Sequence, residues 1–183
     1  MKKENTALYI LRLAITLLLI TSIMAGALAL VNKITAPRIA QLRYEKIQEA
    51  VSEVLPGGGE EVTCFVDGTG LVTNVYASDL GYAVQVAPTG FSDAITMMVG
   101  VDREGNILGI SIISHTETAG LGAVAAAKNA AGEAFRGQFV GLSDGLTVTK
   151  DGGEIDAITG ATVTSRAICE GVNAAVACAK QNG

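Results

Sequence analysis

Residue types that bind metals are scarce in this chain of 183 residues. It has one histidine, His115, no tryptophan and three cysteines, Cys64, Cys169 and Cys178, with no Cys-x-x-Cys pair. Zinc, haem and iron–sulfur sites each need a set of such ligands at suitable spacing, and the sequence offers no such set. We therefore expect no metal site and assign His115 a structural or hydrogen-bonding role.

The three cysteines do not make a disulfide framework, because their number is odd. Cys169 and Cys178 lie on opposite sides of one predicted helix, so they cannot pair with each other there. Cys64 can pair with either one only if the fold brings them close. The alternative, which we favour, is that all three are small, buried, apolar side chains.

Charged residues are also few, at 17% of the chain, and one long stretch has none. Residues 13–31 are uncharged, and as a helix this run would be roughly 28 Å long, close to the ~30 Å apolar thickness of a bilayer. We predict a transmembrane anchor over residues 13–32. The alternative is a cleaved signal peptide, with small residues at 25–29 as cleavage sites, but such apolar segments are usually only ~7–15 residues long.

The charges that flank the anchor predict its orientation. Lys2, Lys3 and Arg12 precede it, so the positive-inside rule places residues 1–12 in the cytoplasm and the rest of the chain outside. Residues 33–183 carry ten basic and seventeen acidic side chains, a net charge of −7. We therefore expect a single-pass protein of the cell membrane with an acidic extracytoplasmic domain and no nucleic-acid partner.

A helical linker is predicted between the anchor and the domain, over residues 33–60. Residues 33–37 form a short link, and Pro37 suits the first turn of a helix over residues 38–55. Pro56 and the three glycines after it end that helix.

The remaining residues, 61–183, have the pattern of an α+β domain, namely a small curved antiparallel sheet with packed helices. Turn residues at 67–70 and 102–106 predict two hairpins. Alternating apolar residues predict strands over residues 62–66, 71–76, 81–87, 94–101 and 107–113.

Two helices and a further strand are predicted in the second half of the domain. An alanine-rich helix covers residues 123–135, with Gly132 weakening or ending it, and residues 137–141 return to the sheet. A short strand covers residues 146–150. The last helix runs from about 164 to 180, and its apolar face consists of Ile168, Val172, Ala175, Val176 and Ala179.

The segment that precedes this last helix, residues 156–165, combines small residues with hydroxyls. Gly160 tolerates positive φ, and Gly160 and Ala161 leave the backbone accessible. Serine and threonine before a helix form an N-cap, where free N–H groups favour an anion such as phosphate. The segment predicts an attachment site for a phosphorylated cofactor, and the alternative is an ordinary capped turn. Its candidate residues are Thr159, Gly160, Ala161, Thr162, Thr164 and Ser165.

A second loop, residues 114–122, also precedes a predicted helix. Its part from Glu117 to Gly122 reads Glu-Thr-Ala-Gly-Leu-Gly. Together the two loops resemble the FMN-binding domain shared by the G subunit of the Rnf ion-translocating electron-transport complex and the C subunit of the sodium-pumping NADH:quinone oxidoreductase. That family has a Ser/Thr-Gly-Ala-Thr motif, here residues 159–162, and a Glu-Thr-Pro-Gly-Leu-Gly motif, in which Ala119 replaces the proline. Because the quinone-reductase protein is typically longer, the resemblance favours the Rnf protein.

The resemblance implies that FMN is bound through its phosphoryl group to the hydroxyl of Thr162, by a flavin transferase that uses FAD. The phosphoryl anion would then suit the N–H groups of Thr164 and Ser165 at the start of the last helix. It also implies an electron-transfer subunit, which is not a catalyst alone, in a membrane complex. That complex couples electron transfer between ferredoxin and NAD to Na⁺ or H⁺ translocation, with other membrane subunits as partners. The loop expected to lie against the isoalloxazine ring contributes Glu117, Thr118, Gly120, Leu121 and Gly122.

Other interpretations of these residues stay open at this point. Lys150 could offset the phosphate charge, or it could be an ordinary exposed lysine at a strand end. Glu117 could be a surface carboxylate. The whole protein could be a non-redox, membrane-anchored FMN-binding sensor, or a structural protein of the complex without a cofactor.

Overall fold

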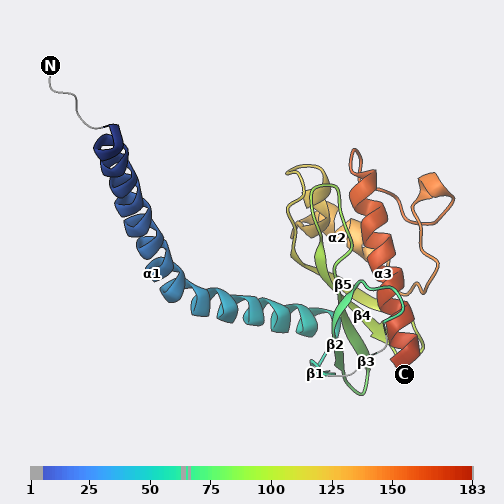
Figure 1. The fold of residues 1–183 in the computed structure, drawn as a ribbon. Coiled ribbons are helices and arrows are strands. Elements are labelled where there is room, and N and C mark those ends of the chain that lie inside the picture. The colour runs from blue at the N-terminus through green and yellow to red at the C-terminus, as the bar shows by residue number, and fades with distance from the viewer. Residues whose placement is uncertain (1–5, 63–64, 66, 183) are drawn as a thin grey trace. The chain divides into compact units, whose positions relative to one another are not determined.

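The structure is a computed structural model that describes residues 6–62, 65 and 67–182. The chain divides into two compact units, with the boundary between Glu45 and Lys46. The first unit is helical, and the second contains the sheet and all remaining elements (Figure 1).

Helix α1 spans Thr6–Val54 and is one continuous helix with Pro37 in its interior. The predicted link at residues 33–37 is therefore wrong. A proline inside a helix removes one backbone hydrogen bond and usually bends or breaks the helix. Here no glycine or second proline lies within ten residues of Pro37, so no other helix-breaking residue adds to the loss of this one hydrogen bond. The predicted end is confirmed, because α1 stops before Pro56 and the glycines.

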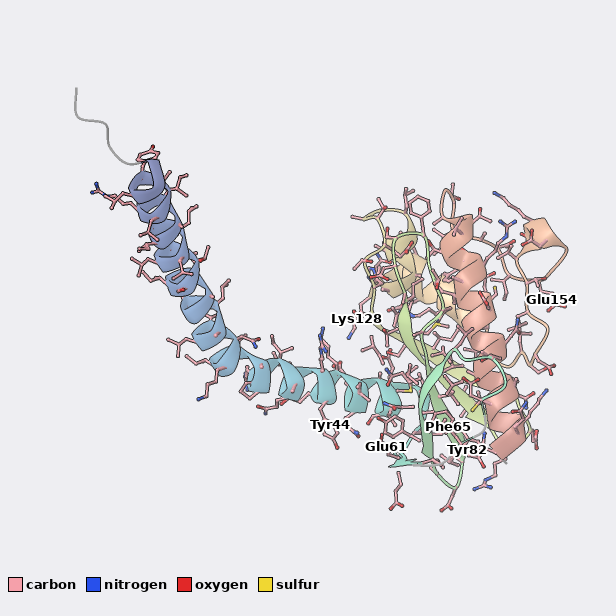
Figure 2. The ribbon with its side chains drawn as sticks, viewed as in Figure 1. Tyr44, Glu61, Phe65, Tyr82, Lys128 and Glu154 are labelled. Atoms are coloured by element: carbon pink, nitrogen blue, oxygen red, sulfur yellow. The ribbon has the colours of Figure 1, made fainter. Side chains whose placement is uncertain are left out.

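The first part of α1 agrees with the predicted anchor. An 18-residue stretch of this helix has a mean hydropathy of 2.4, and α1 is the one helix among the described residues that is long and apolar enough to cross a membrane. Its large apolar side chains from Leu8 to Val31 are exposed and radiate from the helix on all sides (Figure 2). A helix that is apolar all round suits a lipid environment.

Five antiparallel strands form one sheet in the order β1-β2-β3-β4-β5, so the predicted α+β class is confirmed. The strands are β1 Glu60–Glu61, β2 Val72–Ala77, β3 Gly81–Val86, β4 Thr96–Asp102 and β5 Ile107–Ser114. The predicted strand at 62–66 falls partly on residues 63, 64 and 66, which lie outside the described residues. Val62 and Phe65 are not in a strand, and the pairing with β2 is made by Glu60–Glu61 instead.

The two faces of the sheet are covered by different helices. Helix α3, Thr162–Asn182, packs on one face with Ile168, Val172 and Val176 fully buried (Figure 1). The opposite face packs against the last turns of α1, where Val51 and Val54 meet Met98 and Ala83 among others. Alternation along β4 explains both contacts, because successive side chains of a strand point to opposite faces.

Gly100 in β4 allows the end of α1 to approach the sheet closely. A Cβ atom at this position would lie 2.2 Å from the carbonyl oxygen of Val54. Glu53 adds a polar contact on the same side, since its Oε2 accepts a hydrogen bond of 2.6 Å from Ser111 Oγ. Residues 46–54, which we expected in a separate linker, therefore pack as part of the domain.

The single helix predicted over residues 123–135 is wrong. The structure has a 3-10 helix η1, Gly122–Ala126, followed by a separate helix α2, Ala130–Gly137. Asn129 starts α2, because its side chain accepts a hydrogen bond of 3.0 Å from Gly132 N. Gly132 does not end a helix but lies in the first turn of α2, where a Cβ atom would lie 2.2 Å from Ala127 O.

The predicted strand at 146–150 is also wrong. Only Val148 makes a bridge, to Ile155, and Thr149–Asp151 form the 3-10 helix η2. Residues 138–141 follow the end of α2 and form a turn that reaches the sheet through the bond from Gly141 N to Ile107 O. Helix α3 begins two residues earlier than predicted, and its predicted apolar face is confirmed as buried.

Two cysteines are buried in the core, as predicted, with Cys169 3% and Cys178 2% exposed. Cys64 lies outside the described residues. Burial raises the pKa of the Cys169 thiol to about 11. Because the thiolate is the nucleophile, we expect iodoacetamide at pH 8 to modify Cys169 in the folded chain about 100-fold more slowly than in guanidinium. Peptide mass spectrometry measures both rates, and equal rates would contradict the burial.

Candidate functional site

The two loops singled out in the sequence meet through a buried hydrogen bond. The Thr164 hydroxyl, in the first turn of α3, donates to Glu117 Oε2 at 2.5 Å, although 47 residues separate them in the chain. Glu117 is 8% exposed and Thr164 1% exposed. Glu117 is therefore not a surface carboxylate. It joins the 114–122 loop to the start of α3.

A third segment, which sequence reasoning missed, binds the same carboxylate. The backbone N–H groups of Phe91 and Ser92 donate to Glu117 Oε1 at 2.9 and 3.0 Å. The available signal was weak, namely an isolated aromatic residue after the turn residues Pro88 and Gly90 in a chain with few aromatics.

Hydrogen bonding decides the charge state of Glu117. Burial acts to raise the pKa of its carboxyl group, but the bonds from Thr164, Ser92 and Phe91 outweigh it and hold the pKa below its usual value. His115 Nδ1 accepts a hydrogen bond of 3.3 Å from Glu117 N. His115 thus has the hydrogen-bonding role that we predicted. No group of three metal-ligating side chains occurs among the described residues.

The start of α3 leaves three backbone N–H groups for a ligand. The first bond of the helical series runs from Ser165 N to Ala161 O at 3.0 Å, so Thr162, Val163 and Thr164 precede it. The Ser165 hydroxyl is also used, since it accepts from Ile158 N and donates to Ala161 O. Our expectation that the Ser165 N–H faces a phosphate is therefore wrong, while the Thr164 N–H remains a candidate.

A cavity of about 280 Å³ lies between the two loops. Its lining includes most of the predicted site residues, but not Thr159, Gly120 or Ser165. Gly120 is exposed and has a φ of +77°. The residues that line the cavity are Phe91, Glu117, Thr118, Leu121, Gly122, Gly160, Ala161, Thr162, Val163 and Thr164.

Glycine is needed at two positions beside this cavity. A Cβ atom at Gly122 would lie 2.5 Å from Glu117 Oε2 and 2.6 Å from Thr164 Oγ1, so a larger residue would separate the two loops. Gly160 has a φ of +77°, a left-handed conformation that glycine adopts without strain. Both glycines were candidates from the sequence, and their positions explain why small residues occur there.

Thr162 is half-buried at the cavity and has a cationic neighbour. Lys150 Nζ, on η2, donates a hydrogen bond of 3.1 Å to Thr162 Oγ1. Of the two interpretations of Lys150 that the sequence left open, the structure supports the one that places its charge beside Thr162, the predicted attachment residue. Apolar side chains surround the opening, with Phe91 70%, Val163 48% and Leu121 42% exposed.

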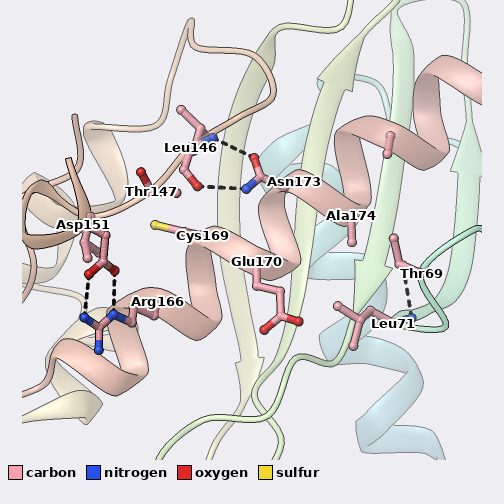
Figure 3. A pocket seen from close by; sticks show the side chains of 12 residues that line it. Thr69, Leu71, Leu146, Thr147, Asp151, Arg166, Cys169, Glu170, Asn173 and Ala174 are labelled. Atoms are coloured by element: carbon pink, nitrogen blue, oxygen red, sulfur yellow. Dashed lines mark hydrogen bonds and ion pairs between the residues drawn. The ribbon is translucent and has the colours of Figure 1, made fainter. Parts of the chain in front are cut away.

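A larger cavity, of about 500 Å³, lies further along α3 and contains none of the motif residues (Figure 3). Its walls include the ion pair between Arg166 and Asp151, the Cys169 thiol and Asn173. The Asn173 side chain exchanges two hydrogen bonds with the backbone of Leu146 and is therefore satisfied. Size alone favours this cavity. The smaller one has the Thr162 hydroxyl, which Lys150 contacts, and the free N–H groups of α3, so we place the candidate site there.

This arrangement suits a ligand with an anionic end and a flat apolar part. The free N–H groups of α3 and Lys150 favour negative charge beside Thr162. Phe91, Leu121 and Val163 offer apolar contacts for a ring system. At about 280 Å³ the cavity is at the small end of ligand sites, so a large ring system would remain partly accessible from outside.

Sequence comparisons identify the domain that contains the two loops. Residues 90–177 match the FMN-binding domain family, and residues 1–54 match the RnfG N-terminal region. The first match begins beside Phe91 and includes both loops and Lys150.

Curated relatives are similar over nearly the whole chain. The G subunit of the ion-translocating oxidoreductase complex of Pseudomonas aeruginosa is 36% identical, covering 91% of this chain and 86% of the relative. The G subunit of the proton-translocating ferredoxin:NAD(+) oxidoreductase complex of Clostridium ljungdahlii is 38% identical, covering 87% and 86%. Its counterpart in the Na(+)-translocating ferredoxin:NAD(+) oxidoreductase complex of Acetobacterium woodii is 33% identical, covering 91% and 90%. The chain therefore belongs to the family of G subunits of ion-translocating oxidoreductase complexes.

Proposed function

We propose that this protein is the membrane-anchored electron-transfer subunit of an Rnf-type complex and carries one FMN bound covalently to Thr162. The observation that carries the proposal is the position of the Thr162 hydroxyl. It lies at the cavity, at the start of α3, and accepts a hydrogen bond from Lys150. A phosphoryl ester at this oxygen would place its negative charge beside the free N–H groups of the helix.

The chain's own residues position and shield the cofactor, whose chemistry when bound is electron transfer. Glu117 holds the two loops and the Phe91–Ser92 segment together. Gly122 and Ala161 leave room between these loops, and Phe91 and Leu121 provide apolar contacts beside the opening. An incompletely covered ring suits a relay, because an electron carrier must come close to its donor and acceptor.

The membrane anchor and the relatives' names support the rest of the assignment. α1 would hold the protein among the other membrane subunits of the complex, with the FMN domain on the extracytoplasmic side. Covalent attachment then prevents loss of FMN from a dilute compartment, and a flavin transferase would supply it from FAD. The relatives named above include one proton-translocating and one Na(+)-translocating complex, so either ion is compatible with this family.

Membership of the family of G subunits favours this proposal over the C subunit of a sodium-pumping quinone reductase. A non-redox FMN sensor is separated from a relay by experiment. Full-length protein would be produced with and without its flavin transferase, purified in detergent, denatured in SDS and examined for flavin fluorescence in the gel. We expect a fluorescent band only with the transferase, and reversible reduction of the folded protein by dithionite and reoxidation by a dye of suitable potential. A dark band from the co-expressed protein would contradict covalent attachment, and attached flavin that does not exchange electrons would contradict the relay.

A further inference from the structure

Lys150 has a position that the two loop motifs do not explain. It lies on η2, outside both motifs, yet its Nζ donates a 3.1 Å hydrogen bond to the oxygen of Thr162. Lys150 is in no ion pair among the described residues, so its ammonium group is not neutralised by direct contact with a carboxylate. The Lys150 ammonium group thus points at Thr162 Oγ1, the atom on which the proposed function depends.

The short helix that carries Lys150 is fastened to α3. Asp151 accepts two hydrogen bonds of 2.6 Å from Arg166, one turn beyond Thr162 on α3 (Figure 3). Hydrogen bonding with Arg166 also holds the pKa of Asp151 below its usual value, so this carboxylate stays charged near neutral pH. This pair holds η2 against α3. Lys150, the residue before Asp151, therefore lies opposite Thr162.

The rest of the loop is folded so that η2 has a defined place. Val148 bridges Ile155, and Thr149 N donates to Ile155 O at 2.9 Å. Gly152, with a φ of +86°, ends η2. Gly153 packs so closely on Thr147 that a Cβ atom would lie 2.1 Å from its carbonyl oxygen. A lysine on a loop fixed at both ends presents its charge at a more constant place than one on a free surface.

We propose that Lys150 is the cation of the FMN attachment reaction: its ammonium group binds the Thr162 hydroxyl before the reaction and a phosphoryl oxygen after it. This inference rests on the proposed function. In the reaction the Thr162 oxygen forms a bond to the phosphorus of the FMN half of FAD. The bond between that phosphorus and the bridging oxygen breaks, and AMP leaves with its electron pair. The Thr162 proton passes to the transferase or to solvent, and nothing is oxidised or reduced.

Lys150 takes no part in the proton transfer and acts by its charge. Negative charge increases on the phosphoryl oxygens as the new bond forms, and a fixed cation beside them lowers the barrier. Because Lys150 is exposed, solvent reduces the effect, and we expect Lys150→Gln to slow FMN incorporation about tenfold at limiting transferase. Lys150→Arg keeps the charge with a different donor geometry and should restore part of the rate.

The test measures FMN incorporation into full-length protein in detergent, with FAD and purified transferase, for the wild type, Lys150→Gln, Lys150→Arg and Lys128→Gln. Lys128 is the matched control, because it is an exposed lysine paired with Glu49 and belongs to neither loop (Figure 2). Its replacement should leave the rate unchanged. Thermal unfolding of each variant shows whether the fold is kept. The ³¹P signal of the attached group should move in Lys150→Gln and stay in place in Lys128→Gln.

Each outcome has a separate meaning. No incorporation into the wild type would overturn the proposed function and this inference with it. Normal incorporation into both the wild type and Lys150→Gln would overturn the role of Lys150 alone. A slow Lys150→Gln whose ³¹P signal does not move, or a Lys150→Arg as slow as Lys150→Gln, would show that the transferase recognises the lysine and would overturn the pairing with the phosphoryl group.

Discussion

Replacing Thr162 with alanine is expected to reduce covalent FMN from one per chain to none, while the protein still folds. The hydroxyl oxygen is the atom that would form the ester. No other side chain of residues 156–165 combines a place in the cavity lining with a hydroxyl that is not already bonded to the backbone or a carboxylate. Ser165 is fully buried and its hydroxyl is already bonded to the backbone. Thr164 already donates its hydroxyl to Glu117. Flavin fluorescence in an SDS gel and intact mass measure the loss.

The loss of flavin must not come from unfolding, and the chain offers matched controls. Thr162 is half-buried at the first position of α3, so its alanine variant should change the free energy of unfolding by less than about 1 kcal/mol. Thr162→Ser keeps a hydroxyl and should keep attached FMN. Thr159→Ala removes an exposed hydroxyl outside the cavity and should also keep it. Full flavin loading of Thr162→Ala would contradict the assignment of Thr162 as the attachment residue.

Replacing Glu117 with alanine should lower the free energy of unfolding by about 3 kcal/mol. The carboxylate accepts bonds from Thr164 Oγ1, Phe91 N and Ser92 N, and alanine leaves all three donors without this acceptor in a mostly buried place. The loops should also separate, so FMN attachment should become slow. Urea unfolding of the full-length chain in detergent, followed by circular dichroism, measures the change. Glu154→Ala is the control, since Glu154 is exposed, and its effect should be within about 0.5 kcal/mol.

The contribution of Glu117 to the free energy of unfolding should depend on pH. Its pKa is lowered in the folded state, so the folded protein holds this proton less strongly than the unfolded chain. The stabilisation is therefore complete above the unfolded pKa, near ~4.3, and is lost as pH falls through the lower folded pKa. The stability difference between the wild type and Glu117→Gln should be constant from about pH 6 to 8 and shrink below about pH 4. A difference that grows on acidification would contradict the hydrogen-bonded carboxylate.

Local patterns predicted the sheet and the last helix well, because each has a clear local signal. Strands β2 to β5 lie on short apolar runs between turn residues, and the buried face of α3 follows a period of 3.6. The failures occurred where one local contact decides between alternatives. The Asn129 cap divides an alanine-rich segment into two helices. The helix around Pro37 continues because no second helix-breaking residue lies near this proline.

The site was predicted in part for the same reason. Motif residues such as Gly122, Thr162 and Thr164 stand in the sequence with their chemistry visible, and the structure brings them to one cavity. Phe91 and Lys150 were missed or undervalued, because their roles come from distant segments that meet only in the folded chain. The wrong expectation for the Ser165 N–H came from the start of α3, since a helix that begins two residues earlier uses that donor.

The central claim is tested most directly by locating the flavin on the chain. Trypsin cleaves after Lys150 and Arg166, so residues 151–166 form one peptide that contains Thr159, Thr162, Thr164 and Ser165. The peptide would be taken from full-length protein co-expressed with its transferase, and electron-transfer fragmentation would place the added mass. We predict a gain of one FMN minus water on Thr162. The same mass on another hydroxyl, or an unmodified peptide from protein made with an active transferase, would contradict attachment at Thr162.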